Sequence, residues 1–80
     1  MVFQYYADSD MLYIRLADGI STNSEEVAPD IVLDFGDDDQ VIGIEIEDAS
    51  NHVDLAKLEV ASLPIVDLVM RRHVEVAAEL

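Results

Sequence analysis

The sequence predicts a single α+β domain, a four- or five-stranded antiparallel β-meander with one or two C-terminal helices packing on its apolar face. Two observations predict it. Apolar residues alternate with polar ones in several short runs before residue 49, and afterwards they recur at steps of three and four. With 80 residues, 51% of them hydrophobic, and no cysteine, the chain suits one small domain that packing must stabilise. We therefore expect a β-meander over residues 1–48 and a mainly helical segment over residues 49–80.

The first two strands are expected to form a hairpin. Residues 2–6 (VFQYY) and 11–17 (MLYIRLA) are rich in aromatic and branched side chains, and residues 7–10 (ADSD) have the composition of a turn. Asp18-Gly19 then predicts another hairpin-type turn. In the second strand the period of two places on one face Leu12, Ile14 and Leu16.

The middle of the chain contains the clearest strands, at residues 31–35 and 41–47. Residues 20–28 are polar, and we interpret them as a short edge strand holding Glu25 to Val27, with a loop as the alternative. Alternation in the two clear strands directs a set of apolar side chains inward: Ile31, Leu33, Phe35, Ile42, Ile44 and Ile46.

An acidic connection, GDDDQ at residues 36–40, separates these two strands. A calcium loop needs oxygen ligands at positions 1, 3, 5 and 12 and a glycine at position 6. Counted from Asp34, position 3 is Gly36 and position 6 is Asp39, so the required residues are missing. Glycine and aspartate tolerate turn dihedrals, and we therefore predict a hairpin turn here.

Two helices are predicted after residue 48. The first is expected over roughly residues 50–62, because Val53, Ala56, Val60 and Leu63 recur at helical spacing. Ser62 and Pro64 suit the first turn of a second helix, with a last strand over Val74–Ala78 as the alternative for its end. The apolar stripe of that helix would contain Val66, Val69, Met70, His73, Val74, Ala77 and Leu80.

The charge balance excludes direct nucleic-acid binding. Eighteen acidic residues against four basic ones give a formal net charge of −14, which repels a phosphate backbone. The acidity indicates either a cationic partner or a high-salt host, and the single lysine favours the high-salt host. No positive leader or membrane-length apolar run is present, so we expect no membrane association and a cytoplasmic location.

The sequence predicts no catalytic residue, metal site or cofactor. Asp48 and His52 are four residues apart and could share a metal ion on a helix face, but two ligands at this spacing are common by chance. Glu45 and Glu47 share one side of a strand, where solvated carboxylates are the usual interpretation.

Two segments resemble a known family. Residues 6–16 (YADSDMLYIRL) and 41–50 (VIGIEIEDAS), together with the strand Ile31 to Asp34, are similar to the signatures of the small prokaryotic proteins grouped as domain of unknown function 2283. The resemblance covers about residues 5–51, with Ala7 and Met11 departing from the usual pattern. It implies a compact antiparallel sheet in a prokaryotic cytoplasm, with no established activity. It also makes four motif acids candidates for a shared binding surface: Asp8, Asp34, Glu45 and Asp48.

Three functions are compatible with these features. The leading hypothesis is a non-enzymatic binding module that self-associates into a homo-oligomer, because the apolar face and stripe exceed what so short a chain readily buries. The first alternative is an acidic, antitoxin-like partner that neutralises a small basic protein. The second is a small metal-dependent protein built on Asp34, Glu45, Asp48 and His52.

Overall fold

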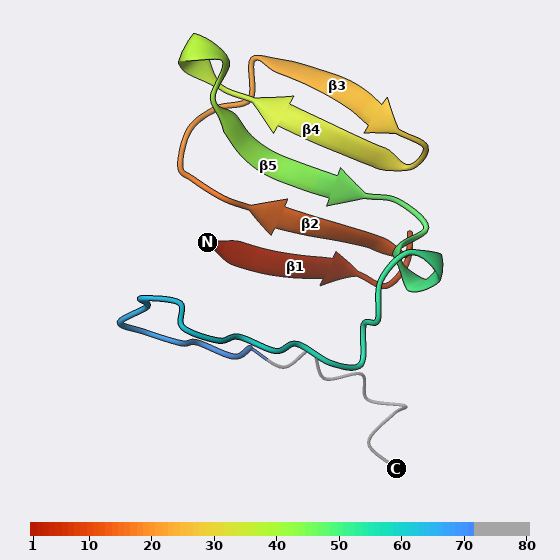
Figure 1. Ribbon diagram of the computed structural model, residues 1–80. Helices are drawn as coiled ribbons and strands as arrows, with labels where there is room; N and C mark the ends of the chain where they lie inside the picture. Colours follow the sequence, from red (N-terminus) through yellow and green to blue (C-terminus); the bar gives the residue numbers. More distant parts are fainter. Residues whose placement is uncertain (72–80) are drawn as a thin grey trace.

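A computed structural model describes residues 1–71 and shows a five-stranded antiparallel sheet with the order β1-β2-β5-β4-β3 (Figure 1). The strands are β1 (Val2–Tyr6), β2 (Met11–Arg15), β3 (Asn23–Ala28), β4 (Ile31–Phe35) and β5 (Val41–Ile46). Two short 3-10 turns are η1 (Asp37–Asp39) and η2 (Ala49–Asn51). The predicted antiparallel sheet is thus confirmed, with five strands.

The predicted meander order is wrong, because β5 lies between β2 and β4. A meander would place β3 beside β2, whereas the chain crosses from β2 to the far edge of the sheet (Figure 1). The composition of the strands explains this order. β5 (VIGIEI) is the more apolar strand and takes the centre, while β3 (NSEEVA) carries two glutamates, which protect an exposed edge from further pairing. The predicted edge strand around residues 25–27 is confirmed.

The strand registers gather the apolar residues on one face of the sheet. Phe3 lies opposite Ile14, Ile14 opposite Ile44, and Leu33 opposite Ile44, so these four form one row across four strands. A second row consists of Tyr5, Leu12, Ile46 and Ile31. We call these two rows the apolar face. The predicted alternation in β2, β4 and β5 is therefore confirmed.

The acidic connection between β4 and β5 is a hairpin turn, as predicted. The Gly36 N–H donates to the Gln40 carbonyl at 2.8 Å, and η1 lies between them. Asp38 and Asp39 adopt left-handed backbone angles, with φ of 59° and 56°, which aspartate tolerates better than most residues.

The predicted helix over residues 50–62 is wrong, since the chain is irregular from η2 to residue 71. Asp54 accepts a hydrogen bond from the Ala56 N–H at 2.9 Å, a local turn that competes with helical hydrogen bonds. Ser62 is left-handed, with φ of 58°, and Pro64 follows two residues later. A short isolated helix is only marginally stable in water. The apolar stripe of the predicted helix has no packing partner, so packing does not offset the free-energy cost of these two breaks.

The second predicted helix is also wrong as far as residue 71. The rest of it, with His73 and the alternative strand Val74–Ala78, lies outside the described residues. Within residues 1–71, no helix has the length and apolar character needed to cross a membrane.

Candidate functional site

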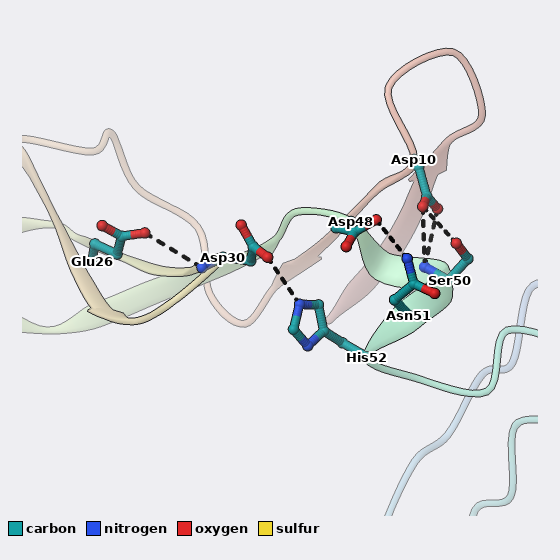
Figure 2. A network of polar contacts seen from close by, with 7 residues as sticks. All are labelled: Asp10, Glu26, Asp30, Asp48, Ser50, Asn51 and His52. Atoms are coloured by element: carbon teal, nitrogen blue, oxygen red, sulfur yellow. Dashed lines mark hydrogen bonds and ion pairs between the residues drawn. The ribbon is translucent and has the colours of Figure 1, made fainter.

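Polar side chains from three connections meet at one end of the sheet (Figure 2). Asp10 ends the β1–β2 turn, Asp30 lies in the β3–β4 turn, and Asp48 is the second residue after β5. His52 comes immediately after η2. These residues meet because the antiparallel strand order brings both turns and the end of β5 to the same end of the sheet. An open depression of about 460 Å³ lies there, lined by Ser9, Asp10, Met11, Asp30, Glu45, Glu47 and Asp48.

Asp10 ties the first hairpin to η2. Its carboxylate accepts hydrogen bonds from the Ser50 hydroxyl at 2.6 Å, the Ser50 N–H at 3.1 Å and the Tyr5 hydroxyl at 2.8 Å. Its main-chain carbonyl also accepts from the Ala49 N–H at 2.8 Å. The hydrogen bond from the Ser50 side chain, followed by that from Tyr5, lowers the pKa of Asp10. With its oxygens occupied in this way, Asp10 has a structural role.

A second group consists of Asp30, Asp48 and His52, and we call it the end cluster. His52 Nε2 lies 3.1 Å from Asp30 Oδ2, and Asp48 Oδ1 accepts a hydrogen bond from Asn51 Nδ2 at 2.9 Å. One ligand-type atom from each of the three residues lies within 4.8 Å of the other two. The Asp30 N–H is held by Glu26 Oε2 at 3.3 Å, which fixes the turn that presents the Asp30 carboxylate. Figure 2 shows the Asp30 and His52 side chains pointing toward one another.

A third feature is a carboxyl pair on the polar face of the sheet, opposite the apolar face. Asp34 is only 5% exposed and accepts a hydrogen bond from the Ser24 hydroxyl at 2.6 Å. The hydrogen bond to Asp34, desolvation, and repulsion from Asp34 and Glu47 raise the pKa of Glu45 to about 7. Glu45 therefore keeps its proton up to near neutral pH.

The four sequence-predicted acids do not form one surface. Glu45 and Asp48 line the depression, and Asp34 contacts Glu45 from the neighbouring strand. Asp8 is exposed in the β1–β2 turn and does not line the depression.

Sequence reasoning missed Asp10 and Asp30 as members of the site. Asp10 was interpreted only as a turn residue, and Asp30 was given no role in a site. Asp30 meets His52 across 22 positions and Asp10 meets Ser50 across 40, so no local pattern indicates either contact.

The raised pKa of Glu45 predicts a pH-dependent contribution to stability. A carboxyl whose pKa rises on folding, from 4.5 to about 7, stabilises the fold fully below pH 4.5 and loses this contribution as pH rises through 7. Glu45→Gln mimics the protonated form. We expect the variant to be more stable than the wild type by about 1 kcal/mol at pH 8, a value discounted for solvent screening, and to match it at pH 4. Denaturant unfolding at several pH values measures this difference.

Glu25→Gln is the matched control, because it removes the same charge from the strand next to β4 but on the opposite face from Asp34. The difference between Glu25→Gln and the wild type should stay constant across the neutral range. A Glu45→Gln curve parallel to that of the wild type from pH 4 to pH 8 would contradict the raised pKa of Glu45.

The chain was compared with known families, curated proteins and solved structures. One family model, described as "Protein of unknown function (DUF2283)", matches residues 3–50, a span that contains β2 to β5 and most of β1. Neither the curated proteins nor the solved structures gave a significant match. The resemblance seen in residues 6–16 and 41–50 is therefore confirmed. Because the match covers more than half of the 80 residues, the chain belongs to the family of proteins of unknown function DUF2283.

Proposed function

We propose that this protein is a non-enzymatic binding module that self-associates through the apolar face of its sheet. One observation carries the proposal. Among residues 1–71, the buried hydrophobic side chains are Ile42, Ile46 and Ala49. A sheet with one apolar face is stable only when a second layer covers that face, and the described part of the chain contains no helix to do so.

The apolar face has the anatomy of an interface. Phe3 and Tyr5 at its β1 side are 47% and 40% exposed, although both are large aromatic side chains. Ile14, Leu33 and Ile44 in its centre are only half-buried. Beyond Leu33, the row that begins at Phe3 ends at a charged residue on β3, Glu25. Exposed aromatics with a polar rim are typical of surfaces that bind another protein.

A second copy is the occupant that best matches this surface. A partner chosen for its positive charge would be attracted to the carboxylates of the polar face and the depression, whereas the apolar rows contain no charge. A face without charge lets two copies approach despite a net charge of −14 on each. A two-fold pairing of identical faces is also the commonest form of oligomer.

The apolar face alone is smaller than a standard interface, so we propose that other parts of the chain also contribute to the dimer interface. The four strands of the apolar face, spaced about 4.8 Å apart and about 17 Å long, give a flat area of roughly 330 Å² per copy. A standard interface needs about 800 Å² per partner. Exposed apolar side chains of the irregular segment after η2 supply the rest in our proposal: Leu55, Leu58, Val60, Leu63 and Ile65.

Association of two such acidic chains should strengthen with salt. Screening weakens the repulsion between the copies, while burial of apolar area is little affected by added KCl. We therefore expect the dimer to dissociate at low ionic strength and to form in molar KCl.

The test compares two neighbouring substitutions on β1 that introduce the same charge on opposite faces. Phe3→Asp places a carboxylate on the apolar face, and Gln4→Asp places one on the polar face. We expect Phe3→Asp to raise the dimer Kd at least tenfold, about 1.4 kcal/mol, and Gln4→Asp to leave it within about twofold. Sedimentation velocity across a concentration series in 2 M KCl gives both values.

Both positions are exposed at an edge strand, so neither variant should unfold the sheet, and circular dichroism checks this. A wild-type chain that remains monomeric at about 100 µM in molar KCl, which corresponds to a free energy of association weaker than about 5.5 kcal/mol, would disprove the proposal.

An acidic module that neutralises a small basic protein is a second candidate. The observation in its favour is the depression at the end of the sheet, which five carboxylates line: Asp10, Asp30, Glu45, Glu47 and Asp48. Binding of a basic partner should weaken as KCl is added, because salt screens the attraction between opposite charges. This salt dependence is opposite to the one expected for the dimer. A pull-down from the native host at low and high KCl separates the two candidates.

A further inference from the structure

The end cluster contains three side chains of the types that bind metal ions, and none of them belongs to a strand of the sheet. Asp30 comes from the β3–β4 turn, whereas Asp48 directly precedes η2 and His52 directly follows it. One imidazole nitrogen and two carboxylate oxygens converge within 4.8 Å from two separate parts of the chain, the β3–β4 turn and the residues on either side of η2. The apolar face does not include these residues, so this site and the proposed self-association are independent of each other.

We propose that Asp30, Asp48 and His52 bind a divalent transition-metal ion of the Zn²⁺ class. Imidazole nitrogen with carboxylate oxygen is a donor set that suits zinc, whereas calcium and magnesium take oxygen ligands only. Three protein ligands leave the fourth tetrahedral position to a water molecule. Two carboxylates balance the charge of the ion, and the neutral imidazole completes the set.

The geometry requires only a small closure of the site. Bonds of about 2.1 Å in a tetrahedral site place neighbouring ligand atoms about 3.4 Å apart. His52 Nε2 and Asp30 Oδ2 are already 3.1 Å apart. Asp48 is exposed, so a small shift of its carboxylate would close the rest of the 4.8 Å span. The hydrogen bond from Asn51 Nδ2 holds Asp48 Oδ1 and leaves its other oxygen for the ion.

The charges around the end cluster also favour a cation. Asp10, Glu45 and Glu47 line the adjoining depression together with Asp30 and Asp48. Among the described ion pairs, those of Arg15 and Lys57 are made elsewhere, with Asp18 and Glu59. A divalent cation would therefore enter a region of concentrated negative charge, which raises its local concentration.

The experiment is isothermal titration of the metal-free full-length chain with ZnCl₂ in a non-coordinating buffer at neutral pH. We expect saturation at one Zn²⁺ per chain, and a Tm that rises with Zn²⁺ concentration because the ion binds the folded state. His52→Ala and Asp30→Asn should each weaken binding at least about tenfold, since each removes a direct ligand. MgCl₂ and CaCl₂ should give no tight binding.

Two matched controls separate a built site from general attraction to an acidic protein. Asp39→Asn removes one negative charge from the β4–β5 turn, and His73→Ala removes the other histidine of the chain. Both should keep the wild-type affinity for Zn²⁺ within about twofold if only the ligand residues matter. Circular dichroism without metal confirms that every variant is folded.

The NMR resonances of the His52 imidazole give a second readout. Direct ligation should shift the Nε2 signal of His52 at one equivalent of Zn²⁺. The proposal is overturned if titration shows no saturable binding, if Asp39→Asn weakens binding as much as Asp30→Asn, or if Zn²⁺ leaves the His52 signal unchanged. None of these results would bear on the dimer, which is tested through Phe3.

Discussion

Replacing Ile42 with alanine is expected to lower the free energy of unfolding by about 2–5 kcal/mol, through lost burial and the cavity left behind. Ile42 is 2% exposed and is the largest fully buried side chain among the described residues. It packs beside the backbone of Gly36, where a Cβ added to the glycine would lie only 3.2 Å from Ile42 Cγ2. A domain of this size has a total stability of about 5 kcal/mol, so the variant should lie near its unfolding midpoint.

Ile20→Ala is the matched control for this prediction, because it makes the same chemical change at a side chain that is 85% exposed. We expect it to change stability by less than about 0.5 kcal/mol. Urea unfolding followed by circular dichroism measures both variants, at one fixed protein concentration because self-association would add to the apparent stability. Equal costs at the two positions would show that Ile42 is not the centre of the core.

The sequence predicted the features of the sheet that depend on local alternation. The period of two in Ile31 to Phe35 and Val41 to Glu47 correctly placed their apolar residues on one face of the sheet, because shifting a strand by one residue would move its whole apolar set to the other face. Asp37 to Asp39 could likewise be interpreted as a turn, since the two flanking strands leave few other conformations for five residues. Family signatures over residues 6–16 and 41–50 supported the same assignment.

Contacts between distant segments could not be predicted in the same way. The pairing of β2 with β5 joins Leu12 to Ile46, and the alternation in β2 is equally compatible with β3 as its neighbour. Asp30 and His52 meet only because this strand order brings their connections to the same end of the sheet. The spacing of Asp48 and His52 suggested that the two could share a metal ion, but the closeness of Asp30 to both could not be identified without the fold.

The helices predicted after residue 48 show the limit of apolar periodicity as evidence. Val53, Ala56, Val60 and Leu63 have helical spacing, but periodicity predicts a helix only when another surface receives the stripe. In the described chain Val53 is half-buried, and the other three side chains are exposed, as at Val60 with 48%. The hydrogen bond from Ala56 to Asp54 then determines the local conformation. In the proposed dimer these side chains would find their packing surface on the apolar face of the partner copy.

The second large effect is expected at Gly43, in the centre of the sheet. Gly43 is buried in β5, and the Tyr13 ring from β2 lies directly over it. A Cβ at this position would lie 2.9 Å from Tyr13 Cε1 and Cζ and closer still to the hydroxyl oxygen. Gly43→Ala must therefore displace the ring, and we expect a loss of about 1–3 kcal/mol from overpacking. The hydroxyl accounts for part of the clash, so Tyr13→Phe should recover a fraction of this loss.

A double-mutant cycle separates the clash from the properties of alanine itself. In a Tyr13→Ala background no ring opposes the new methyl group, and alanine is favoured over glycine inside a strand by about 0.5–1 kcal/mol. Gly43→Ala should therefore be neutral or stabilising in that background, although it is destabilising in the wild type. The coupling energy between the two sites, obtained from urea unfolding of all four proteins, should exceed about 1 kcal/mol, a size typical of residues in direct contact. If Gly43→Ala costs the same in both backgrounds, the glycine is needed for some feature of the backbone, and the close approach of Tyr13 is not the reason for it.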